Sequence, residues 1–598
     1  MIFPMLDSVP TQRLYTEEFI GLDRRPRTND GAFSDMENMS GDPRPLISSR
    51  KKRGLVAQLQ SPGGMIANGG LAWVDGSTLY FNGQATPVND LASGEKQLVA
   101  MGAYIVIFPD GAYYNTKDGT DYGRIDREWT LGDNDYANFA ICAMDGTEYP
   151  SDAAHMVVSA EEPENPTDGL YWLNTGDEEH ALYQWRQYTS SWIGVPTCYV
   201  KISAAGIGTG LKNQDSVTIS GVRTMGHSDA MKQQLELLNN THVIQAVGED
   251  YIVVIGLIDH AVQQQGALRA DRKAPKMDYI IESNNRLWGC RHGEQDGQTV
   301  NEIYASALGD FKNWRKYLGT SQDSYSVSVG TDGPFTGAIT HRGQPYFFKE
   351  GCVHEIYGEK PSNYQMQTTL CDGVRAGCAR SLQAVNGVLY YLSLNGVQYF
   401  ETLPQAAGEA LGSERYTQGC AGEYNGRYYL SMQDSANNWG LYVLDTTRGT
   451  WHREDASHAL AFARYQDELY MLTADGSIWA LNGTQGTLEE SVSWRADSGV
   501  MGYEYPDNKY LSRFDIRMKL GAGSHCDLKI EYDSSGVWES RGGMDGGSTV
   551  RSYTLPVVPK RCDHLRIRLQ GSGDMQLYGV ARILTMGADG QTKGKITR

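Results

Sequence analysis

Acidic residues stand close together at two places in this chain, Asp118 with Asp121 and Asp133 with Asp135. Paired carboxylates can serve as acid and base in glycoside cleavage, or they can hold a calcium ion. The chain contains 72 acidic residues, however, so close pairs also arise among solvated loop residues. We favour that interpretation and predict no catalytic and no metal-binding residues.

Three tryptophans, Trp172, Trp185 and Trp192, lie within one short segment rich in turn residues. Large aromatic faces can stack on sugar rings, so these three could form a carbohydrate platform. The alternative, which we favour, is that they pack the core of a small β-domain. His354 follows the apolar Val353 in an expected strand, and we predict that it is packed rather than catalytic.

One dense basic run extends from Arg50 through Lys51 and Lys52 to Arg53. It could touch DNA, or it could dock onto an acidic surface of an adjacent subunit. Gly590–Lys595 resembles a phosphate-binding loop only superficially. The motifs HExxH, Gly-x-Ser-x-Gly and GxxxxGK[ST] are missing, as is GxGxxG after a strand. We therefore expect no enzyme activity and no cofactor.

Charge and composition limit the class of protein further. The net charge is −19, and an acidic protein is a poor candidate for gripping nucleic acid, although DNA can pass nearby without being held. No apolar run approaches the ~20 residues of a membrane helix, and the first residues lack the features of a secretory signal. The nine cysteines are scattered without a CxxC pair, which argues against zinc and predicts buried free thiols in a reducing cytosol.

A repeated pattern predicts the fold. The 68 glycines and 36 tyrosines suit tight turns between short aromatic strands, so we expect an all-β chain. A small apolar strand, a turn, an aromatic strand and a second glycine turn recur at a spacing typical of β-propeller blades. The alternative is a run of hairpins in a β-sandwich. About seven such units, and hence about seven blades, begin near Gly70, Gln97, Asp278, Gly337, Leu382, Ala421 and Ala461.

The remaining segments differ in pattern from the repeat. We expect an extended N-terminal arm at 1–60, lying across a neighbouring subunit because it has little core of its own. The β-propeller-like core would occupy 61–124 and 276–494, with an inserted β-domain at 125–275. That domain would contain one short helix within Ser228–Asn240. A C-terminal β-sandwich at 495–590 and a tail at 591–598 complete the predicted organisation.

The N-terminal phrases Phe19–Asp23, Gly31–Ser40 and Arg44–Arg50 resemble the start of structural proteins in tailed-phage and prophage tail modules. The phrases "GLYWLNT…ALYQW…SSWIGV" and "VPKRCDHLRIRLQGSG" resemble the same group. Those proteins are similar in architecture to the packaged-DNA stabilisation protein, or tail nozzle, of short-tailed phages. There, propeller-bearing subunits form a ring below the portal and adaptor.

The resemblance implies a structural virion protein, made in the bacterial host cytoplasm and assembled as a ring, a nozzle or hub, of six copies. It would retain packaged DNA, conduct double-stranded DNA through its lumen during ejection, and contact portal or adaptor proteins and tail fibres or spikes. It carries over no active-site residues. The alternative is a virion-borne or bacterial propeller protein that binds or cleaves carbohydrate, which for cleavage needs carboxylates converging at the propeller mouth.

Overall fold

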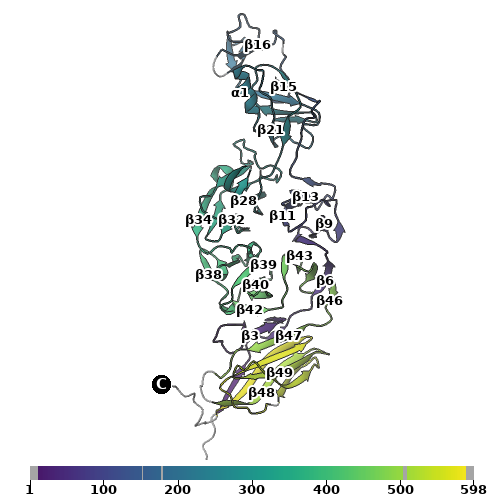
Figure 1. The fold of residues 1–598 in the computed structure, drawn as a ribbon, viewed down its shortest axis with the longest axis vertical. Helices are drawn as coiled ribbons and strands as arrows, with labels where there is room; N and C mark the ends of the chain where they lie inside the picture. The colour runs from purple at the N-terminus through teal and green to yellow at the C-terminus, as the bar shows by residue number, and fades with distance from the viewer. Residues whose placement is uncertain are drawn as a thin grey trace, which may run out of the picture. The chain divides into compact units, whose positions relative to one another are not determined.

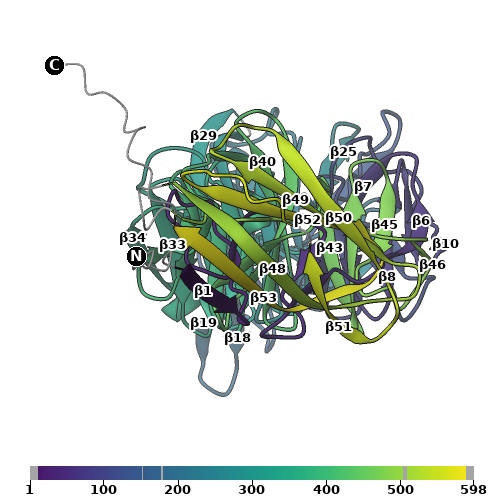
Figure 2. The same ribbon diagram turned by 90° about the horizontal axis from the view of Figure 1, so that it is seen from below.

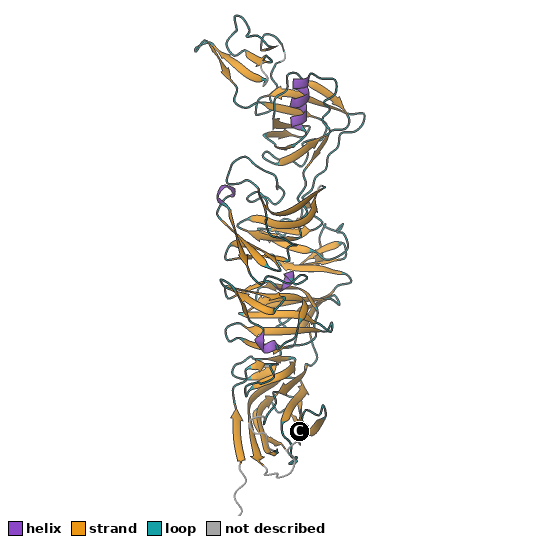
Figure 3. Ribbon diagram, turned by 60° about the vertical axis from the view of Figure 1, so that its left-hand side comes forward, coloured by secondary structure: helices purple, strands orange, loops and turns teal. Residues whose placement is uncertain are grey.

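The computed structural model describes residues 11–150, 152–176, 180–295, 297–502, 508–555 and 557–586. Strands dominate this part of the chain (Figure 3), which contains a single α-helix and three short 3-10 helices: η1 (Pro361–Asn363), η2 (Ala379–Ser381) and η3 (Glu409–Leu411). The chain divides into two compact units. The first comprises residues 1–103, 334–355 and 367–598, and the second comprises 104–333 and 356–366.

Seven small sheets or parts of sheets lie where the repeat pattern predicts the seven units, so the all-β, propeller-like fold class is confirmed. Five are separate sheets of four successive strands, the sixth is four successive strands of a larger sheet, and the seventh has five strands. The first three sheets contain β7 (Pro62–Ala67), β8 (Leu71–Asp75), β9 (Thr78–Phe81) and β10 (Gln84–Ala85); β11 (Gln97–Met101), β12 (Tyr104–Phe108), β13 (Ala112–Asn115) and β14 (Tyr122–Arg124); and β27 (Tyr279–Ser283), β28 (Arg286–Gln295), β29 (Gln298–Ala305) and β30 (Tyr325–Ser328).

The next two sheets contain β31 (Gly337–His341), β32 (Gln344–Lys349), β33 (Cys352–Tyr357) and β34 (Gln365–Leu370); and β35 (Gln383–Val385), β36 (Val388–Ser393), β37 (Gly396–Phe400) and β38 (Pro404–Ala406). The sixth contains β39 (Tyr416–Tyr424), β40 (Arg427–Asp434), β41 (Trp439–Asp445) and β42 (Thr450–Arg453). The seventh combines β43 (Ala459–Tyr465), β44 (Glu468–Thr473) and β45 (Ser477–Ala480) with β6 (Gly54–Gln58) and β46 (Thr487–Leu488).

Local turn chemistry explains why the sequence forms these hairpins. Between β35 and β36, Asn386 and Gly387 have φ values of 50° and 76°. Two successive positive φ values match the two-residue turn that suits the twist of antiparallel strands, and Asn-Gly adopts it at low cost. The following strand β36 is buried along almost its whole length. The turn therefore sets the register, and burial of both faces holds the strand in place.

From residue 11 onward, the N-terminal segment is folded into the first unit, which corrects the expectation of an extended arm for this part of 1–60. In that unit β6 pairs with β45 and so completes the seventh sheet from the opposite end of the chain. Five earlier strands join the C-terminal sheets: β1 (Thr11–Thr16), β2 (Gly21–Leu22), β3 (Ala32–Glu37), β4 (Met39–Ser40) and β5 (Ile47–Ser49). Because short strands pair with partners from distant sequence, the segment looked coreless when read alone.

Two sheets form the C-terminal part of the first unit (Figure 2). One contains β4, β5, β53, β48 and β51, with β1 beside β53. The other joins β47, β52, β49 and β50 through β3 and β2 to β42. Where β2 pairs with β42, Gly21 has a φ of 82°, and a Cβ on Gly21 would overlap the Trp451 carbonyl oxygen, so glycine is required there. The strands are β47 (Ser493–Ser498), β48 (Lys509–Leu520), β49 (His525–Tyr532), β50 (Trp538–Asp545), β51 (Val550–Leu555), β52 (Leu565–Ser572) and β53 (Met575–Met586).

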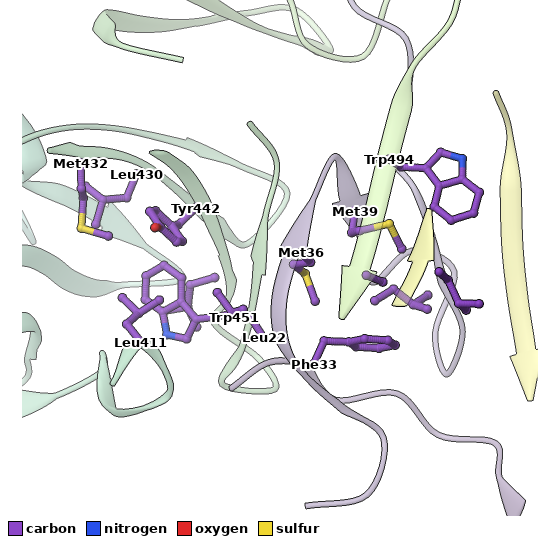
Figure 4. Packing of buried hydrophobic residues seen from close by; sticks show 14 of the residues in the cluster. Leu22, Phe33, Met36, Met39, Leu411, Leu430, Met432, Tyr442, Trp451 and Trp494 are labelled. Carbon is purple, nitrogen blue, oxygen red and sulfur yellow. The ribbon is translucent and has the colours of Figure 1, made fainter. Parts of the chain in front are cut away.

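A continuous hydrophobic core links the sixth sheet to these C-terminal sheets within the first unit. Figure 4 shows Trp451 of β42 beside Leu22 of β2, with Phe33 and Met36 of β3 following toward Trp494 of β47. Trp451 is completely buried, and its indole nitrogen donates to the Ala407 carbonyl at 2.9 Å. The N-terminal strands β2 and β3 therefore connect the sixth sheet to the C-terminal sheets, so that these sheets share one hydrophobic core.

The inserted domain, residues 125–275, belongs to the second unit (Figure 1). It has the predicted helix α1 (Asp229–Leu238), capped by the Ser228 side chain, with Met231, Leu235 and Leu238 buried. Its strands form three sheets: β15 (Tyr136–Cys142), β20 (Tyr199–Ser203), β23 (Ala246–Gly248), β24 (Tyr251–Ile255) and β25 (Val262–Gln265); β21 (Ser216–Ser220), β22 (Thr241–Val243) and β26 (Arg269–Asp271); and β16 (Met156–Ser159), β17 (Tyr171–Asn174), β18 (Ala181–Arg186) and β19 (Ser191–Gly194).

All nine cysteines are free thiols, and seven of them are buried. In the part of the chain that the structure describes, no helix is long and apolar enough to cross a membrane.

Candidate functional site: an aromatic face of the inserted domain

The sheet β16–β19 places four aromatic side chains on one of its faces. Trp172 of β17 is the cross-strand partner of Tyr183 of β18, and Trp185 of β18 is the partner of Trp192 of β19. Cross-strand partners share a face of the sheet, and so do residues two apart, such as Tyr183 and Trp185. We call these four side chains the aromatic face. The register thus brings all three predicted tryptophans together.

The four rings contact one another in a chain. The Trp172 ring stacks on Tyr183 with centroids 5.4 Å apart and an angle of 28° between the planes. Trp172 also lies 5.4 Å from Trp192, which in turn lies 5.4 Å from Trp185 in an edge-to-face arrangement. Distances and tilts of this kind are favourable for aromatic pairs and restrict ring rotation. The face is therefore pre-organised.

The opposite face of the same sheet supplies the core of the domain. Met156, Leu173 and Leu182 point to the other face of the sheet from the aromatic residues. They are buried in one cluster with side chains of α1, β15, β20 and β24. None of the four aromatic side chains belongs to that core cluster. Trp172 is only 8% exposed, whereas Trp185 and Trp192 are half-buried. Trp172 is thus buried, as core packing predicts, but against the other rings of its own face and outside the core cluster, while Trp185 and Trp192 form a surface beside it.

The three indole nitrogens of the aromatic face have partners within the domain. The indole nitrogens of Trp172 and Trp192 donate to the Ser159 carbonyl at 3.1 Å and to the Glu162 carboxylate at 3.0 Å. That of Trp185 donates to the Gln187 side chain at 3.1 Å. Because these indole donors are satisfied, the tryptophans offer their ring faces and edges to a ligand, with Glu162 and Gln187 at the polar rim of the site.

Tyr183 is the member of this site that sequence reasoning missed. The alternation Tyr183-Gln184-Trp185 places its ring on the tryptophan side of the strand, and that alternation was the available signal.

The paired carboxylates do not assemble into a catalytic group. Asp118 accepts bonds from the Thr120 amide and hydroxyl within a turn. Asp121 accepts from the Tyr104 hydroxyl at 2.6 Å, which lowers the pKa of Asp121 and raises that of Tyr104 to about 12. Asp133 and Asp135 are exposed ahead of β15. Among the described residues, no three His, Cys, Asp or Glu side chains form a group suited to a metal ion.

His354 is a fully buried side chain of β33. Its Nδ1 lies 2.8 Å from the Thr368 hydroxyl and its Nε2 lies 3.5 Å from the Cys352 sulfur. Burial, together with the nearby charge of Lys349, lowers the pKa of His354 to about 4. The imidazole is therefore neutral at pH 7 and serves as a packed, hydrogen-bonded side chain.

The two arginines of the basic run are used within the chain, whereas Lys51 is exposed and Lys52 is partly buried. Arg50 is buried and forms a two-pronged ion pair with Glu489 at 2.6 and 2.9 Å. Arg53, 3% exposed, bonds Glu454 and Asp455, each at 2.6 Å. The acidic side chains that the two arginines contact thus belong to the same unit of the same chain. Gly590–Lys595 lies outside the described residues.

Comparisons with known proteins identify solved structures but no family. No model of a known protein family matches the chain, and no curated protein is significantly similar to it. An exo-β-1,3-galactanase from Phanerochaete chrysosporium is 9% identical over 51% of this chain and 95% of its own, with a TM-score of 0.20. A GH43 glycoside hydrolase with engineered xylanase and arabinofuranosidase activity is 10% identical, covering 52% and 98%, with a TM-score of 0.20. The Trypanosoma rangeli sialidase is 10% identical over 97% of this chain and 96% of its own, with a TM-score of 0.15.

The expectation that the chain is not an enzyme is contradicted by these comparisons, because several of the solved structures that match are described as glycoside hydrolases. At identities near 10% and TM-scores of 0.20 or less, they transfer neither a substrate nor a catalytic residue to this chain.

Proposed function

We propose that this chain is a carbohydrate-binding propeller protein and that the aromatic face of β16–β19 contacts the sugar. The observation that carries the proposal is the placement of Trp172, Tyr183, Trp185 and Trp192 on the face of the sheet that the domain core does not use. Half-buried, pre-organised aromatic rings bounded by polar side chains suit a partner with an apolar face and a hydroxylated rim.

The expected affinity of one such face is modest. Aromatic contacts contribute about 0.5–1.5 kcal/mol each beyond area burial, and a few such contacts correspond to a dissociation constant on the order of 1 mM. Several copies presented together would bind a polysaccharide much more tightly than one copy does.

The test is glycan-array screening of the full chain, followed by calorimetry with the best oligosaccharide. Trp185→Ala and Trp192→Ala should each weaken binding about tenfold, because each removes one partly exposed ring. Tyr136→Ala is the matched control, since Tyr136 is a 52% exposed aromatic of the same domain that lies outside the aromatic face. Release of reducing ends is measured in the same samples to test for cleavage.

Two results would contradict the proposal: no glycan bound by the wild type, or equal loss of binding in the control and the tryptophan variants.

A second candidate is a ring-forming component of a phage tail that retains and conducts DNA. The resemblance of Phe19–Asp23, Gly31–Ser40 and Arg44–Arg50 supports it, as does the net charge of −19, since an acidic lumen would repel phosphate. The segments of the resemblance contribute β2 to β5, which join the sixth sheet to the C-terminal sheets. Because these strands and the two arginines Arg50 and Arg53 are used within the chain, contacts between subunits would have to come from other residues.

Light scattering and negative-stain imaging, with and without a portal or adaptor protein, test this second candidate. A ring of about six copies with a central hole supports it, and a monomer that ignores the partner argues against it. On this proposal the protein is a virion component, and a glycan-binding face would suit contact with a cell surface.

A further inference from the structure

A serine, a histidine and an aspartate meet at one end of the paired strands β49 and β52. The Ser534 hydroxyl lies 2.8 Å from Nε2 of His564, and Nδ1 of His564 lies 3.1 Å from a carboxylate oxygen of Asp563. Ser534 belongs to the turn that follows β49, and the other two residues directly precede β52. Because β49 and β52 pair as far as Tyr532 and Leu565, the turn and the segment before β52 lie side by side. We call these three side chains the triad.

Hydrogen bonds hold the two segments of the triad together. The Asp533 carboxylate accepts from the backbone amides of Asp563 and His564 at 2.8 and 3.3 Å. The Asp533 amide in turn donates to the His564 carbonyl at 3.0 Å. Nζ of the buried Lys509 donates to the Asp563 carbonyl. Asp533 and Ser534 have φ values of 51° and 50°, a region that non-glycine residues rarely occupy unless their surroundings hold them there.

The contacts of the imidazole determine which nitrogen carries its proton. A carboxylate only accepts hydrogen bonds, so the contact with Asp563 places the proton of the neutral ring on Nδ1. Nε2 is then an acceptor, and it faces the Ser534 hydroxyl. The His564 side chain is 14% exposed, whereas Ser534 is exposed. A sheltered base therefore stands beside a nucleophile that a substrate can reach, which is the arrangement that activates a serine for acyl transfer.

We propose that the triad hydrolyses esters that carry a short acyl group. Ser534 Oγ attacks the ester carbonyl carbon and gives its proton to Nε2 of His564. The bond to the alcohol breaks, the alcohol leaves with that proton, and an acyl-serine ester remains. Water then attacks the acyl group and gives a proton to Nε2, which passes it to the departing serine oxygen as the carboxylic acid is released. Asp563 is a positioning residue that stabilises the imidazolium formed in both steps.

The surroundings of Ser534 indicate the size of the substrate. Asp533, Ser535 and Gly536 beside it in the turn are exposed, and the next residue, Val537, is 63% exposed. Such a surface buries little of a long acyl chain, whereas an acetyl group needs little burial. An exposed serine also reaches an ester that projects from a polymer. The activity does not depend on the proposed function, because the aromatic face belongs to the other unit.

The experiment treats the full chain with a fluorophosphonate probe, locates the label by peptide mass spectrometry, and measures hydrolysis of p-nitrophenyl acetate. The label should lie on Ser534, and Ser534→Ala should lose both the label and hydrolysis above the rate without protein. His564→Gln should slow hydrolysis about 100-fold, the contribution of a general base. Asp563→Asn should slow it more than about tenfold, because an amide at that position favours the wrong tautomer. Ser535→Ala is the matched control: its hydroxyl accepts from the Val537 amide, and its loss should change neither result.

Three results would overturn the proposal: a folded wild type that takes no label, a label on another residue, or equal hydrolysis by the wild type and Ser534→Ala. The site of the label is read in the wild type, so this part of the test does not require any variant to fold. Faster hydrolysis of p-nitrophenyl octanoate than of the acetate would overturn the assignment of a short acyl group. Trp185→Ala should hydrolyse the acetate at the wild-type rate, so failure of the sugar proposal and failure of this one are told apart.

Discussion

The sheets β7–β10 and β16–β19 contain the same cross-strand pair in different surroundings. Trp73 faces Tyr80 with centroids 6.1 Å apart and 7° between the planes, and Trp172 faces Tyr183 at 5.4 Å and 28°. The two tryptophans are almost equally buried, at 7% and 8% exposure. The two pairs thus share their cross-strand pairing and their burial, and we attribute the difference in role to what lies over the rings.

What covers the two pairs differs. Trp73 belongs to a hydrophobic cluster that includes Leu472 of β44 and Ile478 of β45, so another sheet packs over it. Trp172 contacts rings of its own sheet and donates to the carbonyl of Ser159 at the end of β16, and the outer rings Trp185 and Trp192 stay half-exposed. An aromatic hairpin therefore becomes part of the core where another sheet packs over its rings, and it can become a binding surface where no sheet does.

The largest expected difference is in stability. Trp73→Ala should lower the free energy of unfolding by about 3–5 kcal/mol, because it removes a large side chain from a packed cluster. Trp185→Ala should cost about 1 kcal/mol or less, because the ring is half in solvent already. Urea denaturation followed by circular dichroism measures both. Equal losses would remove the distinction between the two sheets.

Ion pairs of the two regions should also differ in their contribution to stability. Arg53→Met removes a buried cation that precedes β6 and leaves Glu454 and Asp455 without it, so we expect a loss of about 3 kcal/mol. Asp152→Asn, in the inserted domain, breaks an ion pair with His155 whose side chains are 58% and 62% exposed, and it should cost less than about 0.5 kcal/mol. Thermal unfolding of the two variants beside the wild type measures both losses. An Arg53 variant as stable as the wild type would show that its ion pairs contribute nothing.

Acid should destabilise the chain through His354. Its pKa is about 4 in the folded state and 6.5 as the reference value, so between these pH values the unfolded chain binds more protons. The stability due to neutral His354 is present above pH 6.5 and lost as the pH falls to 4. The stability difference between wild type and His354→Gln should therefore shrink by about 3 kcal/mol over that range.

Urea titrations at successive pH values check this, with the exposed His155→Gln as the control. A constant difference between wild type and His354→Gln would contradict the assignment.

The smallest expected effect concerns the rim of the aromatic face. Glu162→Gln keeps an acceptor for the Trp192 indole but removes the charge, so ligand affinity should fall only about twofold. Calorimetry with the oligosaccharide selected on the array measures it. A loss as large as that of Trp192→Ala would mean that Glu162 itself contacts the ligand.

Some features could be predicted from local sequence and some could not. The recurring turn and aromatic strand located all seven small sheets, and the spacing of Met231, Leu235 and Leu238 located α1, because both patterns depend on neighbours in sequence. The pairing of β6 with β45 could not be found in this way, since the two strands are more than 400 residues apart. Nor could the partners of Arg53, which come from the other end of the propeller-like repeat.

Local sequence patterns are enough to show that this protein is all-β, that its strands recur in small units, and that three tryptophans lie close together. These depend on side-chain alternation and turn chemistry, which act over a few residues. Only the tertiary structure decided that the N-terminal segment completes sheets, that Arg50 and Arg53 are consumed by internal ion pairs, and that Trp185 and Trp192 remain at a surface. The physical reason is that burial is a property of contacts between segments, and a local pattern states only which side chains can be buried.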